Sequence, residues 1–300
     1  MLAILAATSL ALAQQTDTTL AVRQGMRLDV ENFGGEILVR AWAQDRVRIQ
    51  ASHSSRDRID VVAGASVIRV EAESRHGPAH LVEYQISLPA WMAVELSGVS
   101  TDVRVEGTRA AVRVETVEGE VTVTGGADDV SIQSVEGAVT VTGARARVEA
   151  RSVDGDVRLV DIVGDVMAET VDGSVVIQNA QATDVDANTV DGDIYYIGTI
   201  RDGGRYILST HDGTIAIGMP DGANAAVSVA SFDGEFDASF PVQLRNATPG
   251  RRFSFTIGTG SARVELETFS GQVLLRRPGE VRVPATGSSG APQGRNDESR

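Results

Sequence analysis

An internal repeat of about 18 residues constrains the fold of this chain more than any other feature of its sequence. Four successive units read TVEGEVTVTGGADDVSIQ from Thr116, SVEGAVTVTGARARVEAR from Ser134, SVDGDVRLVDIVGDVMAE from Ser152 and TVDGSVVIQNAQATDVDAN from Thr170. Each unit, and each later copy of its opening motif, has one glycine at the fourth position: Gly119, Gly137, Gly155, Gly173, Gly192, Gly213, Gly234 and Gly271. A repeat of this length is typical of folds in which each unit packs only on its neighbours.

Within the unit, apolar and polar residues alternate in two short runs. Positions 2, 6 and 8 are apolar, as at Val117, Val121 and Val123, and positions 15 and 17 are apolar again, as at Val130 and Ile132. This period of two predicts short strands with one buried face. We therefore expect the residue at position 2 to face the core, and the Ser/Thr at position 1 and the Asp/Glu at position 3 to face solvent. The glycine allows a bend at which no side chain obstructs the chain.

These features predict an all-β fold, a single-chain parallel β-solenoid with about 18 residues per coil. Right-handed winding is expected, because that is the usual hand of parallel crossover connections. A left-handed hexapeptide helix would require an aliphatic residue at Asp129, and a calcium-binding nonapeptide roll would require two glycine-rich motifs per coil. The sequence fits neither of these solenoids.

The chain is predicted to divide into four segments. Residues 1–13 are apolar and end in Ala11-Leu12-Ala13, which predicts a signal peptide and export to the periplasm, the cell surface or the medium. Residues 14–97 contain irregularly spaced strand-like runs and are expected to form an N-terminal β cap continuous with the solenoid. Residues 98–277 form the repeat domain, interrupted at 241–252 by a loop or strand excursion. Residues 278–300 are rich in Gly, Ser and Pro and are predicted to be a disordered tail.

Charge and composition narrow the function classes. The net charge of −14 argues against nucleic-acid binding, which needs clustered positive charge. The chain has no cysteine, which excludes disulfides and thiolate metal sites. Beyond residues 1–13, no segment has the length and apolarity of a membrane span, so none is expected in the mature chain.

Two rows of polar residues are the candidate functional residues. Stacked coils would align the acids at position 3: Glu118, Glu136, Asp154, Asp172, Asp191, Asp212 and Asp233. The favoured interpretation is turn chemistry, in which an acid before glycine bonds local backbone, and weak cation binding is the second interpretation. The hydroxyls at position 1 form the other row and are interpreted as a ladder that hydrogen-bonds between coils: Thr116, Ser134, Ser152, Thr170, Thr189, Thr210, Ser231 and Thr268. We expect no catalytic residue, no cofactor and no metal.

The recurring [ST]-V-[DE]-G-x-[VI] motif resembles a bacterial family of β-strand-repeat proteins, named as putative adhesins and otherwise a domain of unknown function. Phe33-Gly34-Gly35-Glu36-Ile37 with Ala41-Trp42 looks like the opening strand pair of that family, and residues 84–90 look like its strand leading into the solenoid. The resemblance covers roughly residues 25–277. It implies an exported, non-enzymatic protein of the cell envelope and brings no known ligand.

Two hypotheses follow for the function. The first is an adhesin or scaffold that presents a solenoid surface to a protein or glycan partner of the envelope, with self-association through the solenoid ends as a further hypothesis. The second is a cation-dependent carbohydrate-binding or polysaccharide-acting protein that uses the row of acids. The second requires those acids to converge in a cleft, whereas an evenly solvated convex corner favours the first.

Overall fold

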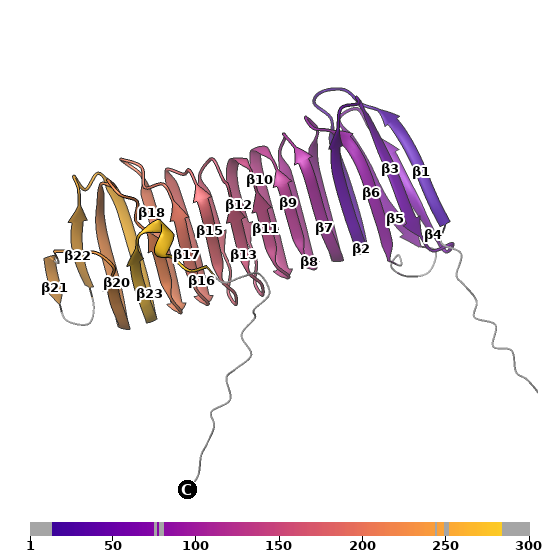
Figure 1. Ribbon diagram of the computed structural model, residues 1–300. Helices are drawn as coiled ribbons and strands as arrows, with labels where there is room; N and C mark the ends of the chain where they lie inside the picture. Colours follow the sequence, from indigo (N-terminus) through magenta and orange to yellow (C-terminus); the bar gives the residue numbers. More distant parts are fainter. Residues whose placement is uncertain (1–13, 75–76, 78–80, 244, 249–251, 284–300) are drawn as a thin grey trace, which may run out of the picture.

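The computed structural model describes residues 14–74, 77, 81–243, 245–248 and 252–283. Within these residues the chain forms strands and one short 3₁₀-helix, arranged as a long rod (Figure 1), so the predicted all-β class is confirmed. The predicted signal peptide at residues 1–13 and the part of the predicted tail at 284–300 lie outside the described residues. No helix in the described ranges is long and apolar enough to span a membrane.

The elements follow one another along the chain in this order: β1 (Gln14–Ala21), β2 (Arg27–Trp42), β3 (Arg46–His53), β4 (Asp57–Ala63), β5 (Val67–Ser74), β6 (Val82–Pro89), β7 (Ala93–Thr108), β8 (Val112–Glu118), β9 (Val121–Gly125), β10 (Ala127–Glu136), β11 (Val139–Thr142), β12 (Arg145–Arg151), β13 (Val157–Val160), β14 (Val166–Glu169), β15 (Val175–Ala180), β16 (Asp184–Asp191), β17 (Ile194–Gly198), β18 (Arg205–Asp212), β19 (Ile215–Gly218), β20 (Ala225–Ala238), β21 (Arg245–Thr248), β22 (Arg252–Ile257), β23 (Ala262–Arg276) and η1 (Pro278–Glu280).

In the middle of the rod, every strand pairs in parallel with the second strand after it. One row runs β8, β10, β12, β14, β16 and β18, and the other runs β9, β11, β13, β15, β17 and β19. Val130 lies beside Val112 on one side and Val148 on the other, a register of 18 residues that agrees with the predicted repeat. Each coil thus contributes one strand to each row.

The core lies between the two rows and is built mainly of small aliphatic side chains. Val121, Val139 and Val157 are fully buried at equivalent positions of three successive coils. Toward the C-terminal end, Tyr196 and Tyr206 pack with ring centroids 5.7 Å apart, and both phenolic hydroxyls donate to backbone carbonyls. β-Branched residues suit such a half-buried pleated surface, which explains the scarcity of large side chains.

The coils at the N-terminal end do not stack in chain order. β2 lies between β7 on one side and β5 with β6 on the other, so residues 67–74 and 82–89 stack outside residues 27–42. β3 then pairs antiparallel with β6, and β1 pairs antiparallel with β3 (Figure 1). These antiparallel strands cover one end of the parallel stack, and such covering protects an exposed strand edge.

The C-terminal end shows the same departure from chain order. β23 is inserted between β18 with β19 on one side and β20 on the other (Figure 1). β22 pairs antiparallel with β20, and β21 pairs with β22. The interval of 37 residues between Gly234 and Gly271 therefore spans an antiparallel excursion, in agreement with the strand excursion considered for residues 241–252.

The beginning of the predicted disordered tail needs a correction. Residues 278–280 form η1, and Pro278 lies against Gly218 of β19. The Glu280 carboxylate accepts hydrogen bonds from the Ser239 hydroxyl and, at 3.1 Å, from the backbone N–H of Arg277. These specific contacts order a segment whose composition alone predicts disorder.

Candidate functional site

The corner that carries the repeated motif has the opposite side-chain orientation from the one that we expect from the sequence. The Ser/Thr at position 1 is buried: Thr170 is 5% exposed, whereas Val171, the next residue, is 46% exposed. The prediction that position 2 faces the core and position 1 faces solvent is therefore wrong. The reason is that position 1 continues the alternation of the preceding strand, in which Val130, Ile132 and Ser134 all point inward.

Most of the buried hydroxyls satisfy backbone carbonyls inside the corner, whereas those of Ser134 and the half-buried Ser231 have no hydrogen-bond partner in the described residues. Those of Ser152, Thr170, Thr189 and Thr210 donate to the carbonyl oxygen of the motif glycine one coil earlier, over 2.9–3.1 Å. A buried carbonyl without a partner is costly, and valine at position 1 could not bond to it. The hydroxyls at position 1 thus link neighbouring coils through hydrogen bonds to the backbone, and not to one another.

The motif glycines stack on one another at the same corner. Gly155 has φ +152° and Gly173 has φ +146°, a backbone conformation that side chains disfavour. A Cβ atom built on Gly173 would lie 2.5 Å from the carbonyl oxygen of Gly155. The close approach of successive glycines brings each glycine carbonyl within reach of the buried hydroxyl of the next coil. The position-2 residue, which follows that hydroxyl in the sequence, then points outward.

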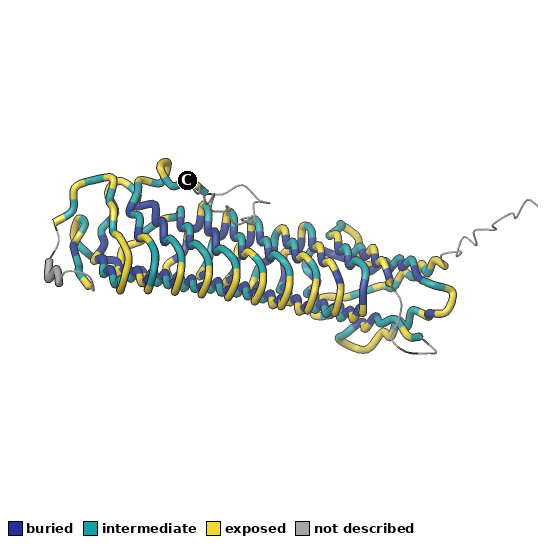
Figure 2. Tube along the Cα trace, turned by 90° about the horizontal axis from the view of Figure 1, so that it is seen from below, coloured by how far each residue is buried: buried dark blue, intermediate teal, exposed yellow. Residues whose placement is uncertain are grey.

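As a result, one side chain per coil projects into solvent in an uninterrupted row, which we call the apolar column. Backbone N–H groups of Val153, Val171 and Val190 donate to the carbonyl of the preceding member of the row, over 3.2–3.3 Å. Exposure of the hydrophobic members ranges from 41% at Val99 to 57% at Phe232. In the order of the stack, the column consists of Phe33, Val99, Val117, Val135, Val153, Val171, Val190, His211, Phe269 and Phe232. With coils about 4.8 Å apart, its nine intervals extend over roughly 43 Å. Exposed segments recur along the length of the rod in Figure 2.

A shallow groove runs beside the apolar column. Its longer part has a volume of about 670 Å³ and is lined by the valines from Val117 to Val190, by the buried hydroxyls and by the outward residue just before each hydroxyl. A second part of about 570 Å³ continues it past His211, Phe269 and Phe232. The groove therefore has one apolar wall and one polar wall.

The aromatic end of the column is a continuous stack. Phe269 lies between His211 and Phe232, with ring centroids 4.7 Å and 4.8 Å away and interplanar angles of 11° and 5°. This order follows from the insertion of β23 between β18 and β20. The faces of the Phe269 ring are thus covered on both sides.

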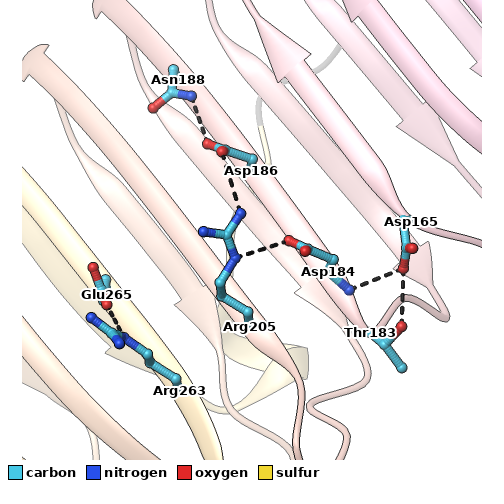
Figure 3. A network of polar contacts seen from close by, with 8 residues as sticks. All are labelled: Asp165, Thr183, Asp184, Asp186, Asn188, Arg205, Arg263 and Glu265. Carbon is cyan, nitrogen blue, oxygen red and sulfur yellow. Dashed lines mark hydrogen bonds and ion pairs between the residues drawn. The ribbon is translucent and has the colours of Figure 1, made fainter.

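Side-chain contacts between neighbouring coils fix the polar wall. Asn188 donates to Asp186 over 2.7 Å, and Asp186 and Asp184 both lie within 4.0 Å of the Arg205 guanidinium (Figure 3). Further toward the N-terminal end, Arg151 is bonded in the same way between Glu149 and Glu169. The guanidinium groups of Arg151 and Arg205 are therefore engaged by acids of the protein itself.

The acids at position 3 lie directly beyond the apolar column and are all exposed. The backbones of Glu136 and Asp154, of Asp154 and Asp172, and of Asp172 and Asp191 pair as isolated parallel β-bridges, so the acids lie in a row along the stack. In the described part of the chain, the one group of three acids able to share an ion is Asp60, Glu71 and Glu73, away from this row. The row lies along a solvated corner, and the cation-dependent or polysaccharide-acting hypothesis has no support in this geometry.

Part of this chain resembles a known protein family. Residues 165–276 match the family model described as Toastrack DUF4097. This stretch of the chain is similar to the Toastrack domain. This confirms the resemblance that the repeated motif predicts. The matched residues include the coils that carry Val171, Val190, His211, Phe269 and Phe232 of the apolar column.

Solved structures also resemble the protein. A putative adhesin from Bacteroides fragilis aligns at 11% identity with a TM-score of 0.44, over 87% of this chain and 97% of that chain. A putative adhesin from Parabacteroides distasonis aligns at 9% identity with a TM-score of 0.39, over 88% and 98%. A putative lipid binding protein from Parabacteroides distasonis aligns at 7% identity with a TM-score of 0.33, over 87% and 96%. No curated protein matches the chain.

Proposed function

We propose that the chain is a non-enzymatic, exported protein of the cell envelope, built as a right-handed β-solenoid, that binds a protein or glycan partner along the apolar column. The observation that carries the proposal is the column itself. It exposes one large side chain per coil over roughly 43 Å, and contiguous exposed apolar surface marks interaction sites in proteins. Isolated exposed valines would need no such explanation, but a row in strict register does.

The proposal includes the organisation that the sequence predicts. Residues 1–13 serve as a signal peptide, residues 14–97 as a cap, residues 98–277 as the solenoid, and the chain that follows η1 as a tail. Export is supported by the apolar N-terminal run and by the resemblance to envelope proteins. An adhesin-like role agrees with a rod that offers a long surface and whose acids line an open corner.

Capture from an envelope extract tests this function. We expect immobilised wild-type protein to retain a protein or glycan that the triple variant Val135→Thr, Val153→Thr, Val171→Thr releases, because threonine keeps the β-branched shape and removes apolar surface. Val62→Thr, at another exposed valine, should retain it. Retention of the same components by all three proteins would contradict the proposal, provided that their melting temperatures agree within a few degrees.

A further inference from the structure

We propose that the partner presents an amphipathic α-helix whose apolar stripe is flanked by Lys or Arg, and that this helix lies along the apolar column. The inference rests on the proposed function and names the chemistry of the partner at that site. Three properties of the corner carry it: the spacing of the column, the charge beside it, and the covered faces of the Phe269 ring.

The spacing favours a helix over an extended strand. Members of the column recur at about 4.8 Å, and a helix brings its apolar stripe round once per turn of about 5.4 Å. Over four coils the mismatch accumulates to roughly 2.4 Å for a helix, but to roughly 7–8 Å for a strand that repeats every 6.6–6.8 Å. One apolar side chain per helical turn can therefore stay beside one valine per coil for about four coils.

The charge favours a cationic partner. Seven carboxylates line the far side of the column at position 3. Glu115, Glu169 and Glu267 line the groove on its other side, where Glu115 is paired with Arg113 and Glu169 with Arg151. The basic residues that line the groove are Arg151 and Arg252, and Arg151 is already paired with Glu149 and Glu169. An apolar stripe with a row of carboxylates on one side and a mixed wall of three glutamates and two arginines on the other is complementary to an apolar stripe flanked by basic residues, which steers association and fixes orientation.

The same features disfavour other ligands. A phosphate-bearing lipid surface would bring like charge against the carboxylates at position 3, which is repulsive. Sugar binding on aromatic residues uses an open ring face, whereas the faces of Phe269 are covered by His211 and Phe232. A cationic amphipathic helix needs only the exposed edges of these rings and the exposed valine methyl groups.

A designed peptide tests the inference with the full-length protein. The probe is an 18-residue peptide of Leu, Lys and Ala with leucines at helical i, i+3, i+4, i+7 spacing and lysines on both sides of them. The first control peptide has the same composition in shuffled order, and the second has Glu in place of Lys. We expect the probe to bind at least tenfold more tightly than either control, with affinity that falls as salt is raised.

Variants then locate the binding surface. The Val135→Thr, Val153→Thr, Val171→Thr protein should lose at least tenfold in affinity for the probe. Asp154→Asn with Asp172→Asn should lose several-fold and show a weaker dependence on salt, because two charges of the acidic margin are gone. Asp128→Asn with Asp129→Asn, at the opposite end of β10, removes as much charge and should bind like wild type.

The outcomes separate this inference from the function on which it rests. Equal affinity for the Glu peptide and the probe, or an affinity that is unchanged in the valine and aspartate variants, contradicts the proposal of a cationic helix. Column-dependent binding of phosphatidylglycerol vesicles without binding of the probe overturns it in favour of a lipid surface. If the probe fails while envelope capture still depends on the column, the helix alone is wrong. Failure of both overturns the proposed function.

Discussion

Replacing Gly173 with alanine should lower the free energy of unfolding by about 3 kcal/mol or more, because backbone strain and a steric clash act together. At φ +146° an alanine occupies a conformation almost restricted to glycine. Its Cβ would also approach the carbonyl oxygen and carbon of Gly155 to 2.5 Å and 2.7 Å, so two stacked backbones would have to separate. Urea denaturation followed by circular dichroism measures the loss.

Gly143→Ala is the matched control for this prediction. Gly143 also has a positive φ, +72°, but nothing lies within 4 Å of a Cβ built on it. It should therefore lose only about 1 kcal/mol from the left-handed conformation. Equal losses at the two sites would contradict the account, because they would show that the glycine stack is not a close contact.

Ending the chain after Ser261 should detach its C-terminal coil. β23 is the parallel partner of β20 and also pairs with β18 and β19, so its removal leaves β20 and β22, with the four-residue β21 on the edge of β22, as a small antiparallel sheet without the stack. So small a sheet, cut off from the stack that buries its apolar face, is only marginally stable in water. We expect amide hydrogens in residues 225–238 and 252–257 to exchange at least a hundredfold faster than in the full chain, as measured by mass spectrometry.

The central coils provide the internal control for the truncation. Residues 112–198 pair only with their neighbours in the stack and should keep their protection. If β20 instead docked on β18, residues 225–238 would remain protected. That result would show that chain order, and not the sequence of β23, decides which coil occupies the position next to β18.

The strands and their parallel register could be predicted because they depend on a local pattern that recurs along the chain. The order of the coils could not be predicted. The motif at Ser231 and the motif at Thr268 carry nearly the same information. In the stack, however, the coil with Thr268 lies between β18 and the coil with Ser231. Which coil is inserted depends on contacts far apart in sequence, such as the antiparallel pairing of β22 with β20.

The candidate site shows a different limit. Position 2 has the parity of the strand that follows the bend, so Val117 resembles Val121 and Val123 and the pattern predicts that it faces the core. Position 1 has the parity of the strand that precedes the bend, and that parity holds up to Thr116. The two alternations conflict at the corner, and the sequence contains a signal for the correct choice: Val112, Val114 and Thr116 continue one unbroken period of two. If position 2 is instead placed in the core, the exposed column is not predicted, and only the row of acids beside it remains as a candidate site.

The most direct test of the account measures which side of the corner is open, by thiol labelling of single-cysteine variants. The chain has no cysteine, so Val153→Cys and Ser152→Cys each introduce the sole thiol. Val153 is 47% exposed and Ser152 is 5% exposed. We predict that Val153→Cys reacts with a maleimide at about the rate of the unfolded chain, and that Ser152→Cys reacts at least roughly a hundredfold more slowly, because its thiol reacts only when the coil opens. A protected thiol at position 153 with a reactive one at position 152 would contradict the exposed apolar column and everything proposed for it.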